Sequence, residues 1–163
     1  MHPTDLTVTA VVQKDDRFLM IEKQSSGLVV VTQPGSQIET GEAPEQALVR
    51  GALRETGCEI AISGLLGVYL WIHPQTREQY LRVVYTAKAI KENFSRQLDH
   101  VVRGVYWYSL ADIKRRGRDL RSPIVLRCVE DCLAGKRQPK EVLAGMTPIQ
   151  QNVAAVMANA CLV

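Results

Sequence analysis

The stretch that most constrains the fold is residues 33–60, which have the pattern of a loop, a helix and a stop. The loop contains Pro-Gly and Thr-Gly pairs, which are typical of turns. Pro44 suits the first position of a helix, because its missing N–H would have no partner there. Gly57 suits the left-handed position that ends a helix. The pattern therefore predicts a helix over 44–56, with small apolar groups on one side and charged groups on the other.

The rest of the chain alternates strands with short helices, and turn residues separate them. Strands are predicted over 7–13, 17–23, 28–32, 65–72, 79–90 and 104–108, and helices over 110–116 and 123–134. With 163 residues, the chain is long enough for one domain with a real core and too short for two comfortable ones.

A different pattern begins near the C-terminal end. Residues 139–145 have the composition of a linker, and an apolar stripe at helical spacing then predicts an extra helix over 149–160. This helix either packs on its own domain, which we favour, or contacts a partner or a second copy of the chain. We therefore expect one domain over 1–140, followed by a C-terminal linker and extra helix over 141–163.

The composition narrows the classes of partner. The net charge of +3 permits a small anionic ligand. The sequence lacks the dense basic stripe that usually accompanies binding of a nucleic acid polymer. No apolar run approaches the roughly 20 residues needed to span a membrane. Four cysteines without a signal peptide indicate packed thiols in a reducing, cytoplasmic setting. The composition leaves both a monomer and a homodimer open.

Residues 36–58 resemble the Nudix box, G-x5-E-x7-R-E-U-x-E-E-x-G-U, in which U is a bulky aliphatic residue. Glu42, Arg50, Glu55 and Gly57 match this pattern. The box is the signature of hydrolases that cleave a nucleoside diphosphate linked to another moiety. The resemblance implies a cluster of glutamates that holds Mg²⁺ or Mn²⁺, which neutralises the diphosphate and activates a water molecule.

The chain also departs from this pattern. Ser36 replaces the first glycine, Gly51 replaces the glutamate after the arginine, and Arg54 replaces the first of the paired glutamates. Three carboxylates on one helical face are thereby reduced to one, Glu55, with a guanidinium beside it. Because a metal cation and a guanidinium repel each other, we expect a weakened or absent metal site and reduced or altered activity.

Sequence outside the box narrows the resemblance to the NudJ-type phosphatases of the Nudix family, over residues 6–139. Its marks are T-V-T-A-V-V, Q-P-G-S, Y-L-W-I-H-P, Y-L-R, L-R-S-P and A-G-K-R-Q-P. These marks are specific only together, in this order and at this spacing. The resemblance implies an α/β protein with the Nudix fold, an α/β/α sandwich with a mixed central sheet. It also implies small phosphorylated ligands, namely nucleoside di- and triphosphates and thiamine-type pyrophosphates.

The box supplies the candidates for metal binding and catalysis. Glu55 and Glu42 are the expected metal contacts, and Glu55 is the expected catalytic residue together with Arg50, which braces the glutamates in the family. A simpler alternative is that Arg50 and Arg54 lie on an ordinary solvated helix face, with Glu55 as a local counter-charge.

Five side chains are candidates for substrate binding. Arg82 lies between aromatic residues in a predicted strand, an unusual place for a charge unless it points into a cleft, and is a candidate phosphate contact. Lys23, which ends a strand near the box, and Arg54 are further candidates for anion binding. Trp71 and Tyr69 either stack on a base or thiamine-like ring or are core aromatics, and we give both alternatives equal weight.

Two functions from different classes follow. The first is a working Nudix phosphohydrolase in which other acids partly replace the lost ones. The second is a catalytically inactive Nudix-fold protein that binds a phosphorylated ligand through basic residues, with a binding or regulatory role. A folded remnant without a ligand is a third possibility. The double substitution Gly51→Glu with Arg54→Glu should raise metal-dependent pyrophosphatase activity sharply if the site is only degraded.

Overall fold

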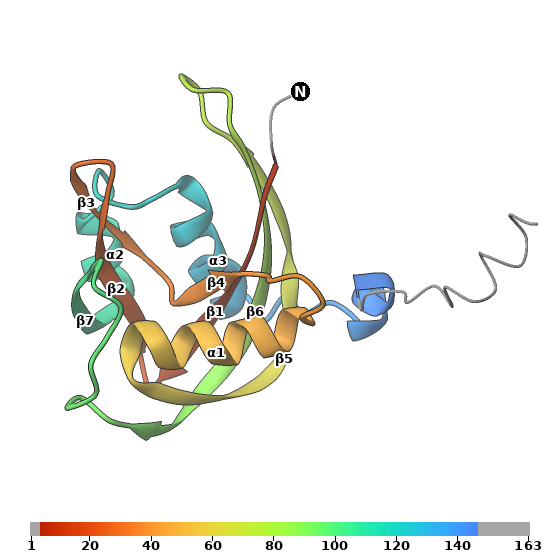
Figure 1. The fold of residues 1–163 in the computed structure, drawn as a ribbon, viewed down its shortest axis with the longest axis horizontal. Coiled ribbons are helices and arrows are strands. Elements are labelled where there is room, and N and C mark those ends of the chain that lie inside the picture. Colours follow the sequence, from red (N-terminus) through yellow and green to blue (C-terminus); the bar gives the residue numbers. More distant parts are fainter. Residues whose placement is uncertain (1–3, 147–163) are drawn as a thin grey trace, which may run out of the picture.

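The computed structural model describes residues 4–146, which form a layered domain of strands and helices (Figure 1). Its strands are β1 (Thr4–Lys14), β2 (Arg17–Ser25), β3 (Leu28–Thr32), β4 (Gly35–Gln37), β5 (Cys58–Ile72), β6 (Gln79–Glu92) and β7 (Val102–Ser109). Its helices are α1 (Pro44–Thr56), α2 (Leu110–Arg115), α3 (Pro123–Leu133) and the 3-10 helix η1 (Lys140–Met146).

The strands form a mixed sheet with the order β3-β2-β1-β6-β5, and β4 and β7 pair with β1 and β2 respectively. β1 runs parallel to β6, with Val8 opposite Val83, whereas it runs antiparallel to β2 and β4. The middle of β1, from Val8 to Val12, is buried on both faces. Such burial is typical of a strand covered by helices on both sides of a sheet.

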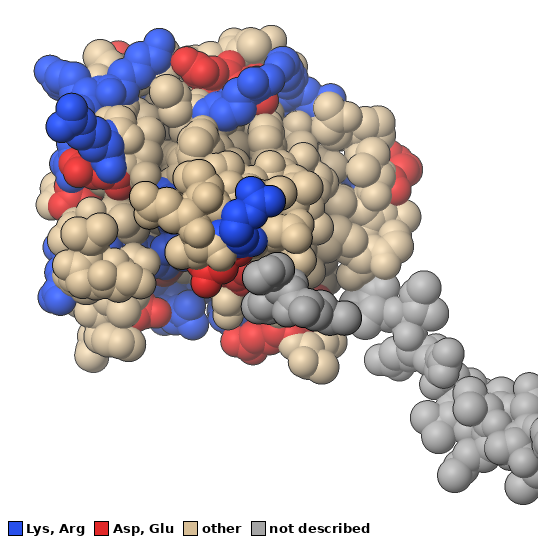
Figure 2. Space-filling model, turned by 90° about the horizontal axis from the view of Figure 1, so that it is seen from above, with Lys and Arg blue, Asp and Glu red and all other residues tan. Residues whose placement is uncertain are grey.

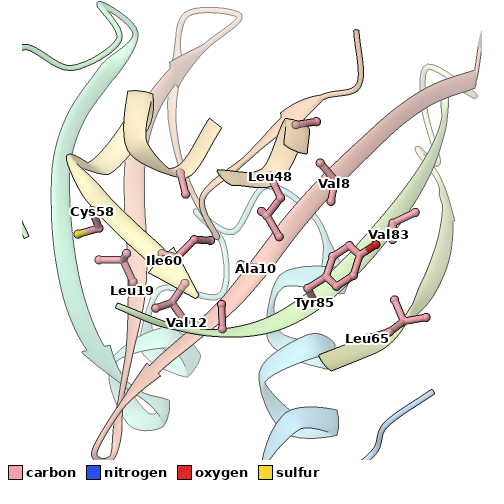
Figure 3. Packing of buried hydrophobic residues seen from close by; sticks show 13 residues of the cluster. Val8, Ala10, Val12, Leu19, Leu48, Cys58, Ile60, Leu65, Val83 and Tyr85 are labelled. Atoms are coloured by element: carbon pink, nitrogen blue, oxygen red, sulfur yellow. The ribbon is translucent and has the colours of Figure 1, made fainter. Parts of the chain in front are cut away.

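Helices cover both faces of this sheet, and the sheet separates the core into two layers. Ala47 and Leu48 of α1 pack with inward-facing residues of β1 and β6, including Val8 and Tyr85 (Figure 3). On the other face, α2 and α3 pack against alternate residues of β1, β2 and β6, such as Val84. The chain therefore forms the expected α/β/α sandwich with a mixed central sheet.

Helix α1 has the predicted bounds. It begins at Pro44, and the side chain of Gln46 accepts a hydrogen bond from the backbone N–H of Ala43 at 3.0 Å. It ends at Gly57, which has φ 72° and donates its N–H to the carbonyl oxygen of Leu53 at 2.9 Å. Glycine adopts this left-handed conformation without the strain that a side chain would introduce.

Some elements differ from the sequence-based expectation. Gly35–Gln37, expected only as a turn, forms the short strand β4 on the edge of β1, and β5 begins at Cys58 rather than at residue 65. Lys140–Met146, where we expected a linker, forms a 3-10 helix. The extra helix expected over 149–160 lies outside the described residues. The division into a domain over 1–140 and a C-terminal segment stays a prediction.

The surface carries charges of both signs. On the face shown in Figure 2, Lys and Arg lie along the top and left sides and at the centre, with Asp and Glu among them. This pattern differs from the continuous basic stripe of a typical nucleic-acid-binding protein. The expectation that no nucleic acid polymer binds stays a prediction.

Within residues 4–146, none of the helices has both the length and the apolar character that crossing a membrane would require.

Candidate functional site

A cavity of about 300 Å³ lies where α1, β1, β2, β4 and β6 meet the segment before α3. Many of the residues predicted to bind metal or substrate line it, although they come from three different elements. They are Lys23 of β2, Arg50, Arg54 and Glu55 of α1, and Arg82 of β6. The fold therefore brings together charged groups that are far apart in the sequence, as expected for a ligand-binding site.

Glu55 is buried in the last turn of α1, with 3% of its surface exposed, and both of its carboxylate oxygens have partners. Lys23 Nζ lies 2.8 Å from Oε1, and the backbone N–H of Gly35 donates to Oε2 at 2.9 Å. A buried carboxylate requires such compensation, because the loss of hydration is otherwise costly. Donors of the protein itself thus already use the oxygens that a metal ion would need.

Glu42 is engaged in a different contact. Arg50 donates to both of its carboxylate oxygens at 2.8 Å, from Nε to Oε1 and from Nη2 to Oε2. The hydrogen bond from Arg50, followed by one from the backbone N–H of Glu39, lowers the pKa of Glu42 to about 2. A bidentate arginine–carboxylate pair of this kind fixes the relative orientation of its two side chains. It fixes the loop before α1 to the helix, and Arg50 Nη1 also lies 3.3 Å from Oε1 of Glu39 in the same loop.

Gly51 is the point at which β4 and α1 come closest. A Cβ atom added at Gly51 would lie 2.4 Å from the carbonyl oxygen of Gly35 and 2.6 Å from Cβ of Ser36. Backbone atoms of β4 therefore fill the space next to the helix that any side chain at this position would need. The substitution Gly51→Glu cannot simply restore an acid, because β4 must first move away.

Arg54 does not extend freely into solvent, although its side chain is 49% exposed. Its Nε lies 3.3 Å from Oδ2 of Asp99, and its carbonyl oxygen accepts the backbone N–H of Asp99 at 3.1 Å. These two contacts hold the loop between β6 and β7 against the end of α1. Arg54 therefore both lines the cavity and connects two parts of its wall.

The residues present do not fit a Mg²⁺ or Mn²⁺ site. Such ions take about six oxygen ligands and usually bind through clustered carboxylates and water. Within residues 4–146, no group of three or more His, Cys, Asp or Glu side chains has the arrangement needed to hold a metal ion. Of the two predicted ligands, Glu55 bonds to Lys23 and Gly35, and Glu42 bonds to Arg50.

Arg82 and Arg121 give the cavity a different chemical character. Arg82 is only 4% exposed, its Nε donates a long hydrogen bond to Thr7 Oγ1 at 3.4 Å, and its Nη1 has no partner among the described residues. Burial lowers the pKa of the Arg82 guanidinium, and the nearby charge of Arg121 lowers it further. Among the described residues, the side chain of Arg121 donates only to Ser25 Oγ, at 3.4 Å. Two cations on the wall of one cavity repel each other, and an anion between them would relieve this repulsion.

Unpaired polar atoms are concentrated in the same wall. Six buried side-chain N or O atoms of residues 4–146 have no hydrogen-bond partner, and four belong to residues that line this cavity. They are Thr9 Oγ1, Thr32 Oγ1, Gln33 Oε1 and Arg82 Nη1. Buried polar groups are nearly always satisfied in folded proteins, so we expect water molecules or a polar ligand to bind to these atoms.

The two predicted aromatic contacts lie elsewhere. The hydroxyl of Tyr69 donates to Asp131 Oδ2 of α3 at 2.9 Å, and the Tyr69 ring packs against the core layer under α3. Trp71 lines a second cavity, of about 410 Å³, which shares Arg121 with the first. The structure thus separates Tyr69 from the charged cavity and places Trp71 beside it.

Sequence reasoning missed several of the residues that line the charged cavity, among them Arg121, Thr9, Thr32 and Gln33. Arg121 lies in an irregular segment just before α3, and the other three are neutral residues in or just after strands. Arg121 belongs to the motif L-R-S-P, which marks the family resemblance but does not by itself assign a role to Arg121. This motif was the one signal that pointed to this segment.

Comparisons with known proteins agree with this architecture. The family model described as the NUDIX domain matches residues 3–128. Phosphatase NudJ of Shigella boydii serotype 4 is 25% identical over 143 residues, which are 88% of this chain and 92% of that protein. Phosphatase NudJ of Escherichia coli strain K12 has the same identity and the same coverage. A solved NUDIX hydrolase from Nitrosomonas europaea is 32% identical, with a TM-score of 0.81, over 86% of this chain and 96% of that one.

Proposed function

Because this chain belongs to the Nudix family, we propose that its charged cavity binds the phosphate groups of a small molecule, a nucleoside di- or triphosphate or a thiamine-type pyrophosphate. We further propose that it hydrolyses the diphosphate bond slowly, compared with family members that have every acid of the box. Binding through basic side chains then replaces much of the binding that a metal ion provides elsewhere.

The observation that carries this proposal is the pair of guanidinium groups of Arg82 and Arg121. Arg82 is almost fully buried, its Nη1 has no hydrogen-bond partner among the described residues, and Arg121 lines the same cavity. A buried cation without a carboxylate partner is costly for the folded protein. A phosphate group between the two arginines would remove this cost and accept charge-assisted hydrogen bonds from both.

Slow hydrolysis follows from the surroundings of Glu55. Nudix hydrolases generally use divalent metal ions, and a bound ion supplies charge neutralisation and an activated water molecule. In this chain Lys23 and the backbone of Gly35 hold the Glu55 carboxylate, while Gly51 and Arg54 stand where the box has glutamates. The charge of a diphosphate can be neutralised by Lys23, Arg82 and Arg121. These cations do not remove a proton from water, and Glu55 is the single carboxylate left on that helical face for this role.

A second candidate function is ordinary metal-dependent hydrolysis. It is favoured by the names of the two relatives from Shigella boydii and Escherichia coli, each of which is called a phosphatase. It requires a diphosphate to bring its own metal ion and to draw Lys23 away from Glu55. The expected cytoplasmic location and the choice between monomer and homodimer stay predictions under either function.

One experiment separates the two functions. We would measure the binding of inorganic pyrophosphate by calorimetry, in EDTA and in excess Mg²⁺ or Mn²⁺, and phosphate release from nucleoside triphosphates and thiamine pyrophosphate under the same conditions. Binding in EDTA with slow turnover is expected. Binding and rapid turnover that both require the metal would establish the second function instead. An absence of binding in both conditions would overturn the proposed function.

A matched pair of variants tests the place of binding. Arg82→Met removes the buried guanidinium, whereas Arg118→Met removes an exposed arginine outside the cavity and causes the same change of net charge. Pyrophosphate affinity should fall in Arg82→Met and stay within about twofold in Arg118→Met, because exposed charges are well screened. Equal losses in both variants would point to nonspecific attraction by net charge.

A further inference from the structure

The second cavity shares one wall residue, Arg121, with the first. Its volume is about 410 Å³, within the usual range for a small-molecule site. Trp71 of β5 and the apolar residues Leu120, Pro123 and Leu126 contribute to its walls. We propose that it binds the planar aromatic ring of the same phosphorylated ligand, with the phosphates in the charged cavity. This inference rests on the proposed function.

The Trp71 ring is held in position before any ligand arrives. Its centroid lies 5.4 Å from that of Tyr80, at an interplanar angle of 30°, and 5.3 Å from that of His73, which is nearly edge-on. Because these contacts already order the Trp71 side chain, little of its conformational entropy is lost when a ligand ring binds. Trp71 therefore offers a pre-organised surface on which a flat ring can stack.

The charges around this cavity favour an uncharged ring over a second phosphate group. Arg127 lines the cavity, but its Nε already pairs with Asp131 Oδ1 at 3.0 Å. Glu130, which pairs with Lys114 at 3.6 Å, adds a carboxylate to the same wall. Two arginines and one carboxylate thus line this cavity, against five basic residues and three carboxylates in the charged cavity. Arg121 is shared with the charged cavity, so it marks the boundary between the part of the ligand that carries phosphate and the part that does not.

Ser122 supplies a polar group for the edge of such a ring. It precedes α3 and is 6% exposed, yet its hydroxyl neither caps the helix nor has any other hydrogen-bond partner among the described residues. Serine at this position normally bonds to a backbone N–H of the first helical turn. A rotation of its side chain would give a nucleobase or an aminopyrimidine one hydrogen bond, since the hydroxyl both donates and accepts.

The chemistry of this cavity suits nucleobases and the pyrimidine ring of thiamine alike. Both are flat heteroaromatic rings with polar edges, and each belongs to a ligand with a diphosphate, joined through ribose in ADP and through the thiazolium ring and its hydroxyethyl group in thiamine pyrophosphate. The ligands to compare are therefore inorganic pyrophosphate, which has no ring, and ADP and thiamine pyrophosphate, which have one. Calorimetry in EDTA would measure the three affinities for the full chain. The ring should strengthen binding roughly 5- to 100-fold over pyrophosphate.

Variants of β5 locate the ring. Trp71→Ala should abolish the advantage of ADP and thiamine pyrophosphate while pyrophosphate affinity stays within about twofold, and Trp71→Phe should keep much of that advantage. The control is Leu70→Ala, the adjacent residue on the strand, which is 60% exposed and lines neither cavity. Unchanged pyrophosphate binding also shows that each variant is folded.

The outcomes distinguish the two proposals. If neither pyrophosphate nor the ring-bearing ligands bind the natural protein, the proposed function fails, and this inference fails with it. If pyrophosphate binds and the ring adds nothing, only the inference is overturned. The same holds if the ring strengthens binding equally in the natural protein and in Trp71→Ala, because the ring then lies elsewhere.

Discussion

The ammonium group of Lys23 lies 2.8 Å from a carboxylate oxygen of Glu55, so a cation supplied by β2 neutralises the one acid that α1 retains from the paired glutamates of the box. The Lys23 side chain is 23% exposed and that of Glu55 is 4% exposed, which makes this a largely desolvated ion pair. Pairs of this kind are costly to break from one side, because the remaining charge stays buried without a partner.

We expect Lys23→Met to lower the free energy of unfolding by about 2–4 kcal/mol, because Glu55 would lose its counter-charge. Urea denaturation at neutral pH would measure this change. Lys14→Met is a suitable control, since the pair of Lys14 with Glu92 is 3.1 Å long but more exposed, and its loss should cost at most about 1 kcal/mol. Equal costs in the two variants would contradict the structural importance of the Lys23 pair.

The same variant should respond to metal ions. Without Lys23, a carboxylate oxygen of Glu55 becomes available, so millimolar Mg²⁺ or Mn²⁺ should raise the melting temperature of Lys23→Met more than that of the natural protein. Thermal unfolding with and without the ion would detect the difference. If both proteins respond alike, Lys23 does not compete with a cation for Glu55.

Gly51→Ala should destabilise the protein by about 1–3 kcal/mol, because the new methyl group meets the backbone of β4. This result would reverse the usual preference, since alanine in a helix interior is about 1 kcal/mol more favourable than glycine. Gly145→Ala, for which nothing lies within 4 Å of the added carbon, is the control and should change stability little. A gain in stability for Gly51→Ala would show that β4 yields easily.

Arg82→Met should separate stability from binding. The free energy of unfolding should stay constant or rise by about 1 kcal/mol, because a buried cation without a carboxylate partner is replaced by an apolar chain of similar size. Pyrophosphate affinity should fall roughly 10- to 100-fold with the loss of charge-assisted hydrogen bonds. Denaturation and calorimetry on the same sample would measure both changes. A marked loss of stability would indicate that Arg82 serves the fold rather than a ligand.

The pair formed by Glu42 and Arg50 should make stability depend on pH. The pKa of Glu42 in the folded protein is about 2, below its ordinary value of 4.5. The stability that the pair contributes is therefore fully present above pH 4.5 and is lost as the pH falls towards 2. Glu42→Gln should therefore destabilise the protein more at pH 6 than at pH 3, as measured by urea denaturation. The same substitution made in Arg50→Gln should have a much smaller effect at pH 6, because the partner is already missing.

Local sequence patterns predicted much of the fold and only part of the site. The bounds of α1 followed from Pro44 and Gly57, whose backbone preferences act within the chain neighbourhood. β4 was missed because three residues that follow a proline have no readable period, and only pairing with β1 orders them. The box resemblance pointed to Glu55 and Arg50, and the position of Arg82 within a strand pointed to a cleft.

What the sequence could not indicate was the partner of each charge. Lys23 and Glu55 are 32 positions apart, and their contact depends on how β2 packs beside α1. Arg121 belongs to an irregular segment, in which side-chain direction follows from tertiary packing rather than from a period. The close approach of Gly51 to β4 was equally invisible, because a glycine within a helix has several possible causes.

The contact of Gly51 with β4 also restricts the routes by which this protein could regain a full set of acids. A glutamate at position 51 is tolerated only after the segment around Gly35 has moved, yet that segment donates its N–H to Glu55. The two changes are thus epistatic, and the order in which they occur matters. Laboratory evolution towards a metal-dependent enzyme should therefore diversify residues 33–37 before it diversifies the helix.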